Sequence, residues 1–181
     1  QIADQRLGLV LGPPGTGKTF TLSWMALAYL EACRREGLPC RVMVTAFTRN
    51  AAANVLEAIA EKAREVLEVE VPIYFAGRGP DKGVADGVEL LKDRQFSKVI
   101  KQDHLVVGCT TWTLYKFLEK GYHGGGKNSR VADLFDLVCI DEASQLQVPQ
   151  GLMGLAGLRE GGRVLVAGDN KQLAPIGGGY D

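Results

Sequence analysis

Strand-sized apolar runs alternate along this chain with stretches whose apolar residues recur every three or four positions. The runs are residues 7–11, 41–46, 71–76, 104–109, 135–140 and 163–168. We predict a first helix that begins after residue 17 and is stopped by Gly37 and Pro39. Further helices are predicted over 50–67, 88–102, 110–120 and 147–155. Strands joined by helices imply right-handed crossovers and a parallel sheet covered on both faces. The expected fold is therefore α/β, a three-layer sandwich.

Ligands of such sheets bind beyond the carboxyl ends of the strands. The residues expected at those ends are Gly12, Thr45, Gly108, Asp141 and Gly168. Small and polar residues gather on that one edge, so we expect a functional site there.

A glycine-rich segment, GPPGTGKT, follows the first strand and opens the first helix. It matches G-x-x-x-x-G-K-[ST] in the context that a phosphate-binding loop requires, and an ordinary Gly/Pro turn is the alternative. Backbone N–H groups and the helix N-terminus would cradle phosphates, with the lysine on the β- and γ-phosphates and the last hydroxyl on Mg²⁺. The residues are Gly12, Pro13, Pro14, Gly15, Thr16, Gly17, Lys18 and Thr19. The sequence therefore predicts ATP or another nucleoside triphosphate, with magnesium.

Two adjacent carboxylates, Asp141 and Glu142, end the apolar run FDLVCI. Beside a magnesium–phosphate ligand, Asp141 is placed to hold the metal and Glu142 to deprotonate an attacking water. The alternative is that they only cap the following helix. The pair favours a hydrolase over a small-molecule kinase.

The last apolar run leads into GDNKQLAP. The amide of Gln172 can donate to a γ-phosphate oxygen and accept from the attacking water, so we predict a catalytic role for it. Asp169 and Asn170 are expected to shape the turn.

Composition describes an ordinary globular domain without a strong charge. The 181 residues are 46% hydrophobic, and 21 basic residues balance 21 acidic ones, so any nucleic-acid face must be local. The four cysteines show no metal-binding spacing, which fits reduced thiols and a cytoplasmic or nuclear setting. No membrane span is expected.

In order, GPPGTGKT, TAFTRNAAANVL, VVGCTTWTL, FDLVCIDEASQ and GDNKQLAP resemble motifs I, Ia, Ic, II and III of superfamily 1 helicases. The resemblance covers residues 7–176 and is nearest to the branch containing the nonsense-mediated-decay helicase and the replication nuclease–helicase. It implies the first of two RecA-like domains, spanning residues 1–181, of an ATP-driven motor that moves on single-stranded DNA or RNA, usually 5′ to 3′. The partners implied are the nucleic acid and the second domain.

The resemblance places nucleic-acid contacts in motifs Ia and Ic. Thr48 or Asn50 could cap the second helix and leave backbone N–H groups for a phosphate, and Phe47 could stack on a base. Thr110 and Thr111 offer hydroxyls of the same kind. The alternative is that the threonines only cap helices and Phe47 is core. Trp24 and Trp112 are expected to pack inside.

Some features of the family are missing. No clear adenine-gripping glutamine motif precedes the loop, and motifs IV to VI, with their arginine finger, are absent from the sequence. Two other functions therefore stay open, a P-loop ATPase of another class, such as a remodelling enzyme, and a nucleotide-gated binding module without turnover.

Overall fold

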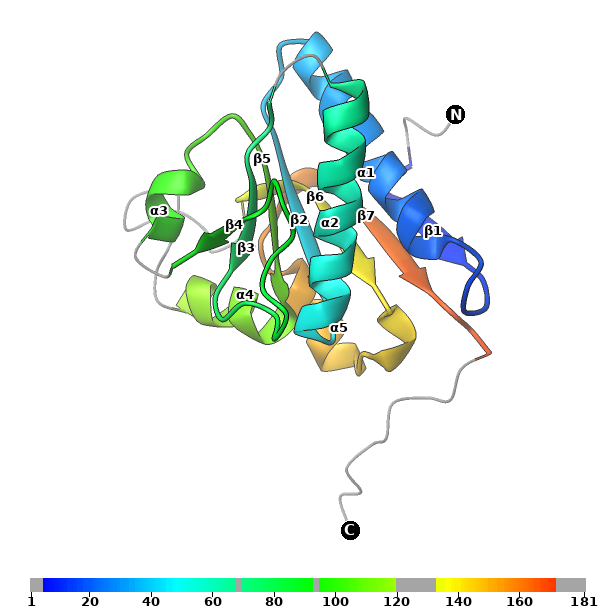
Figure 1. Ribbon diagram of the computed structural model, residues 1–181. Helices are drawn as coiled ribbons and strands as arrows, with labels where there is room; N and C mark the ends of the chain where they lie inside the picture. Colours follow the sequence, from blue (N-terminus) through cyan, green and yellow to red (C-terminus); the bar gives the residue numbers. More distant parts are fainter. Residues whose placement is uncertain (1–4, 68–69, 93–94, 120–132, 172–181) are drawn as a thin grey trace.

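The computed structural model describes residues 5–67, 70–92, 95–119 and 133–171, and these form a wholly parallel, seven-stranded sheet (Figure 1). The strands lie in the order β1-β7-β6-β2-β5-β3-β4. Their bounds are β1 (Leu7–Leu11), β2 (Cys40–Ala46), β3 (Ile73–Ala76), β4 (Glu89–Leu91), β5 (His104–Thr110), β6 (Phe135–Asp141) and β7 (Leu158–Gly168). The parallel sheet predicted from the alternating pattern is confirmed.

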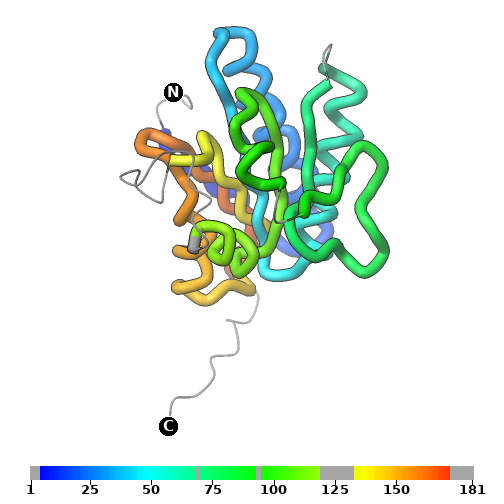
Figure 2. Tube along the Cα trace, turned by 90° about the vertical axis from the view of Figure 1, so that its left-hand side faces the viewer, coloured from blue at the N-terminus to red at the C-terminus, as the bar shows by residue number. Residues whose placement is uncertain are grey.

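Helices cover the sheet on both faces. They are α1 (Lys18–Arg35), α2 (Arg49–Val66), the short α3 (Phe96–Val99), α4 (Thr111–Glu119) and α5 (Val148–Leu155). One core lies under α1 and α2, and a second lies under α3, α4 and α5. In the orthogonal view of Figure 2, α4 and α5 run next to each other in front of the strands. The predicted three-layer sandwich is confirmed.

Strand β2 shows why both cores form. Its residues Val42 and Val44 belong to the first core, while Met43 between them belongs to the second. Successive side chains of a strand point to opposite faces, so a central strand buried on both faces needs an unbroken apolar run.

The first two helices begin and end as their sequences indicate. Helix α1 ends before Gly37, and Pro39 follows two residues later. Gly37 has a φ of 68°, which glycine adopts without strain. Helix α2 is capped by Thr48, whose hydroxyl accepts a hydrogen bond of 3.1 Å from the Ala51 N–H.

The helix predicted over residues 88–102 is wrong. Residues Glu89–Leu91 form β4 instead and pair with β3, Tyr74 standing opposite Glu89. Only Phe96–Val99 are helical in the described part of this stretch. Hydrogen bonds to a neighbouring strand, which a local pattern cannot reveal, outweighed a weak helical preference. The sequence also predicts a surface segment over the glycine-rich stretch 121–130, which lies outside the described residues.

All four cysteines are free thiols, Cys33 half-buried and the other three buried. Within the described ranges, no helix combines the length and apolarity needed to cross a bilayer.

Candidate active site

The glycine-rich loop joins β1 to α1. Gly15 and Gly17 have φ values of 77° and 81°, the left-handed region that glycine enters without strain. The Thr16 hydroxyl donates to Pro13 O at 2.7 Å, and the Gly12 N–H donates to Gly168 O at 3.2 Å, which ties the loop to β7. No side chain caps the N-terminus of α1, so its first N–H groups remain available to an anion.

Lys18 is the first residue of α1, and its side chain folds back over the loop. The ammonium donates to Gly12 O at 2.7 Å and to Pro13 O at 2.9 Å. Its positive charge is therefore held above the loop whose N–H groups and helix N-terminus favour phosphate.

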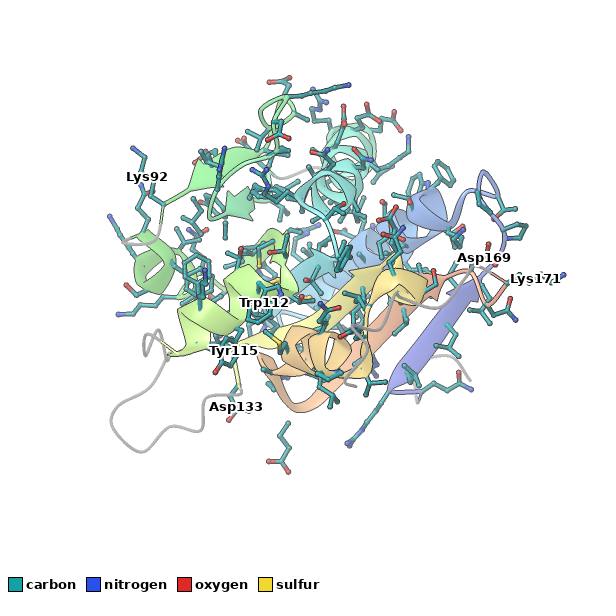
Figure 3. All side chains as sticks on the ribbon, turned by 90° about the horizontal axis from the view of Figure 1, so that it is seen from below. Lys92, Trp112, Tyr115, Asp133, Asp169 and Lys171 are labelled. Atoms are coloured by element: carbon teal, nitrogen blue, oxygen red, sulfur yellow. The ribbon has the colours of Figure 1, made fainter. Side chains whose placement is uncertain are left out.

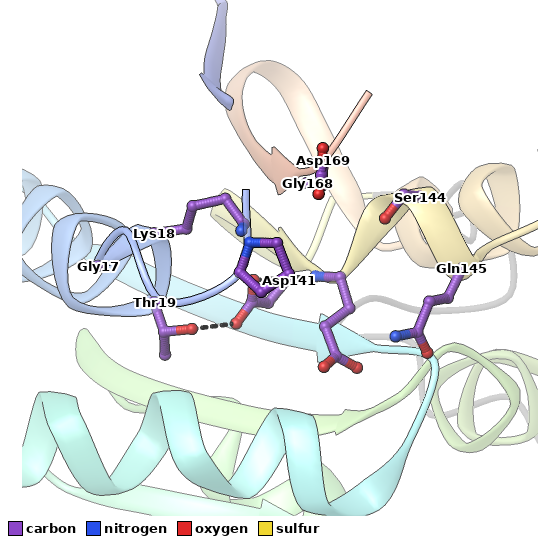
Figure 4. Close-up of a pocket in the computed structure, with 11 residues that line it drawn as sticks. Gly17, Lys18, Thr19, Asp141, Ser144, Gln145, Gly168 and Asp169 are labelled. Carbon is purple, nitrogen blue, oxygen red and sulfur yellow. Dashed lines mark hydrogen bonds between the residues drawn. The ribbon is translucent and has the colours of Figure 1, made fainter. Parts of the chain in front are cut away.

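Thr19 meets Asp141 although 122 residues separate them in sequence. The Thr19 hydroxyl donates to Asp141 Oδ2 at 2.8 Å (Figure 4), and the Glu142 N–H donates to Asp141 Oδ1 at 2.9 Å. Asp141 is only 4% exposed. A hydroxyl and a carboxylate oxygen are hard donors of the kind Mg²⁺ takes when phosphates and waters complete its shell. The residues present therefore fit magnesium.

Glu142 has a left-handed backbone, with φ 51° and ψ 38°, which is uncommon for a residue with a side chain. It precedes a short 3₁₀ helix, Ala143–Gln145, and its side chain makes no capping hydrogen bond there. Burial raises the pKa of the Glu142 carboxyl, the charge of Asp141 raises it further, and Lys18 opposes both. In this structure the Glu142 carboxylate therefore does not act as a helix cap.

These groups share one cavity of about 460 Å³ at the carboxyl edge of the sheet (Figure 4). From the predicted set it brings together Pro14, Gly15, Gly17, Lys18, Thr19, Asp141 and Glu142. Gly12, Pro13 and Thr16 do not line the cavity but form the loop beneath Lys18. Gln172 lies outside the described residues, so its role stays a prediction.

Four further residues that received no binding role from the sequence also line the cavity. They are Ser144, Gln145, Gly168 and Asp169. Each lies within a few residues of the carboxyl end of β6 or β7, which is the signal that could have identified them. Asp169 accepts a hydrogen bond of 2.9 Å from the Lys171 N–H, so it shapes the turn as predicted.

The residues expected to contact nucleic acid lie at the ends of β2 and β5. Phe47 is 46% exposed rather than core, and Asn50 is exposed in the first turn of α2, which Thr48 caps. Thr110 Oγ1 lies 3.0 Å from Thr113 Oγ1 and accepts from the Thr113 N–H at 3.3 Å, so Thr110 stabilises the start of α4. The Thr111 hydroxyl, expected at the surface, is buried, with the residue 2% exposed.

The two tryptophans differ in how far they are exposed to solvent. Trp24 is half-buried and packs edge-on against Phe20, with ring centroids 6.2 Å apart. Trp112 is 56% exposed, so the prediction that it packs inside is wrong. Thr111, not Trp112, faces the interior, where its methyl lies against the small Gly154 of α5.

A family model described as AAA domain matches residues 1–178. The putative helicase mov-10-B.1 of Danio rerio is 28% identical over 93% of this chain and 16% of its own length. The DNA polymerase alpha-associated DNA helicase A of Schizosaccharomyces pombe is 28% identical over 96% of this chain and 30% of its own length. The ATP-dependent helicase NAM7 of Saccharomyces cerevisiae is 27% identical over 97% of this chain and 19% of its own length. The chain thus spans less than a third of each relative.

Among solved structures, a nuclease-deletion mutant of the Type ISP restriction-modification enzyme LlaGI, in complex with a DNA substrate mimic, has a similar fold. The TM-score is 0.61 at 15% identity, over 98% of this chain and 17% of that one. This likeness supports the RecA-like fold. Together with the family match and the helicase relatives, it leads to one conclusion. The chain belongs to the AAA domain family and is a RecA-like domain of the superfamily 1 helicase type.

Proposed function

We propose that this chain is the ATP-binding motor domain of a helicase or translocase, which hydrolyses ATP with Mg²⁺ to move along single-stranded DNA or RNA in the 5′ to 3′ direction. The observation that carries the proposal is the 2.8 Å hydrogen bond from Thr19 to Asp141 beside Glu142, on the cavity that the phosphate loop also lines. The residues proposed for phosphate binding, metal binding and proton transfer thus lie around one cavity.

Each residue has a distinct task. The loop N–H groups and Lys18 bind the β- and γ-phosphates, and Thr19 and Asp141 would hold Mg²⁺. When bound, the ion neutralises charge on the phosphates. Glu142 orients a water and accepts its proton, a role that its raised pKa suits. Gln172 is proposed to contact the γ-phosphate and that water.

The nucleic-acid strand would cross the ends of β2 and β5. Phe47 supplies a ring for stacking, and the α2 N-terminus with its Thr48 cap, Asn50 and Thr110 supplies polar groups for phosphates. Thr111 is left out of this path because it is buried. A second RecA-like domain is proposed to close the cavity and supply the arginine finger. The free thiols fit work in the cytoplasm or nucleus.

Two other functions differ from this one in their response to nucleic acid. A remodelling ATPase would hydrolyse ATP at the same rate with or without a strand. A nucleotide-gated module would bind ATP and a strand without turnover, and the half-buried Glu142 beside Asp141 argues against that.

The test is the ATPase rate of the full-length protein with single-stranded DNA, with RNA and with neither. We expect slow hydrolysis alone and a strong increase with at least one strand type. Hydrolysis indifferent to both strands would point to the remodelling class, and strand binding without hydrolysis would point to the gated module.

A further inference from the structure

Helix α4 carries two exposed aromatic residues that the proposed ATP chemistry does not use. Trp112 is 56% exposed and Tyr115 is 41% exposed, and their rings meet edge-to-face with centroids 6.5 Å apart at 89°. Figure 3 looks from below onto the carboxyl edge of the sheet, and both side chains lie on α4 there. Tryptophan is among the side chains that gain most from burial, so such exposure beside a proposed binding edge calls for a ligand.

The strand register places Phe47 and Trp112 just beyond the ends of neighbouring strands. Ala46 of β2 stands opposite Thr110 of β5, so the chain leaves the sheet at neighbouring points into Phe47 and into Thr111–Trp112. Three exposed aromatic side chains therefore follow the ends of two adjacent strands. Adjacent strands lie about 4.8 Å apart, so one strand of nucleic acid can cross both strand ends.

Charge on α4 fits a phosphate backbone. Lys116 is exposed four residues after Trp112, on the same side of the helix. It forms an ion pair with no carboxylate in the part of the chain that the structure describes.

Phe20 of α1 is also exposed, but its ring already has partners within the chain. Trp24 packs against it edge-on, and the Lys62 ammonium lies 5.4 Å from its ring centre.

The local structure also keeps Trp112 in position before any ligand arrives. The first turn of its helix is held by hydrogen bonds between Thr110 and both the hydroxyl and the N–H of Thr113. The Tyr115 ring packs against the Trp112 ring. An aromatic ring held in place loses little freedom on binding.

We propose that Trp112, supported by Tyr115, stacks on an unpaired base of single-stranded nucleic acid and continues the path that begins at Phe47. The inference rests on the proposed function and adds a binding residue to it. Stacking tolerates any sequence because every base has an aromatic face, and Lys116 would attract the adjoining phosphate.

The test measures binding of labelled oligo(dT) and oligo(U) to the full-length protein by fluorescence anisotropy. Trp112→Ala should raise Kd roughly tenfold, since stacking on one base contributes on that scale. Trp112→Phe should restore most of the affinity, while Trp112→Leu, which keeps apolar area without a ring, should not. Leu38→Ala is the matched control, because Leu38 is also 56% exposed but lies in the turn before β2, at the opposite edge, and should bind as wild type does.

A second readout uses tryptophan emission. The chain has two tryptophans, so Trp24→Phe leaves Trp112 as the sole reporter, and its emission should fall when oligo(dT) binds. The signal should weaken with an oligonucleotide whose bases are removed, and Trp112→Ala should lose little further affinity for that strand.

The outcomes separate the two proposals. If the full-length wild-type protein binds neither strand, the nucleic-acid function fails and this inference fails with it. If wild type binds and Trp112→Ala binds equally well, only the inference is overturned. Full rescue by Trp112→Leu would also overturn it, because apolar area and not stacking by a ring would then account for the affinity.

Discussion

The carboxyl edge of the sheet has two halves with different chemistry. At the ends of β1, β6 and β7, charged groups are held by short internal hydrogen bonds around a cavity, as with Lys18 on loop carbonyls and Thr19 on Asp141. At the ends of β2 and β5, exposed rings and hydroxyls stand on an open surface. A highly charged phosphate and a metal need fixed charges, whereas flat neutral bases need accessible rings.

Strand β2 joins the two halves. Ala46 stands opposite Asp141 of β6 on one side and opposite Thr110 of β5 on the other. The acidic and the aromatic halves are thus separated by two strand spacings, roughly 10 Å. Strand β2 therefore pairs directly with one strand of each half.

The largest effect is expected from Lys18→Ala. Removing the ammonium leaves the β- and γ-phosphates without their cation, so ATP binding and hydrolysis should be lost. Isothermal titration with ATP·Mg²⁺ measures this, and single-strand binding without nucleotide serves as the control and should not change. Unchanged ATP affinity would show that the phosphate site lies elsewhere, and lost strand binding would show that the two halves are not separate.

Glu142→Gln should separate binding from chemistry. The amide keeps the shape but cannot accept the proton of water, so kcat should fall roughly 10²- to 10⁴-fold while ATP·Mg²⁺ still binds. Steady-state ATPase assays of the full-length protein and titration of the same variant give both numbers. Loss of ATP binding with this substitution would assign Glu142 to the ligand site and not to proton transfer.

Gly108→Ala should destabilise the aromatic half. An added Cβ on β5 would lie 2.5 Å from Leu56 Cδ1 and 2.7 Å from Leu56 Cγ, so α2 would have to move. We expect the free energy of unfolding to drop by about 1–3 kcal/mol in urea titrations. Gly151→Ala in α5 is the control, because nothing lies within 4 Å of its added Cβ, and it should cause no loss. An equal loss in both variants would contradict the close packing of α2 on β5.

The smallest effect concerns Glu142 and pH. Burial and Asp141 raise the pKa of Glu142 above its usual value, so the ionised carboxylate destabilises the folded state. At pH 8 Glu142→Gln should therefore melt slightly above wild type. As the pH falls through the raised pKa, the difference in melting temperature between the variant and wild type should narrow. It should vanish below about pH 4.3, where the carboxyl is protonated in the unfolded state too. A difference in melting temperature that grew toward acid pH would contradict a raised pKa for Glu142.

The sequence was sufficient for the acidic half because chemistry there follows fixed spacing. A strand, six loop residues and Lys18–Thr19 mark the glycine-rich loop by their spacing alone, and the carboxylates at the end of β6 must emerge at the same edge. Ser144 and Gln145 were not assigned because nothing in a single sequence says which side of a 3₁₀ turn faces a cavity.

The sequence was insufficient where tertiary contacts decide. Periodicity on the nine-residue α4 did not reveal that Thr111 faces inward, where its methyl packs near Gly154 of α5, while Trp112 is exposed. The strand Glu89–Leu91 depends likewise on its pairing with β3, a partner that lies outside any local window.

The most direct test of the account is a crystal structure of this chain with a non-hydrolysable ATP analogue and Mn²⁺ in place of Mg²⁺. We expect an anomalous Mn²⁺ peak within bonding distance of Thr19 Oγ1 and near Asp141, with the γ-phosphate between Lys18 and Glu142. A triphosphate bound away from the glycine-rich loop, or a metal bound without Thr19 and Asp141 nearby, would contradict it.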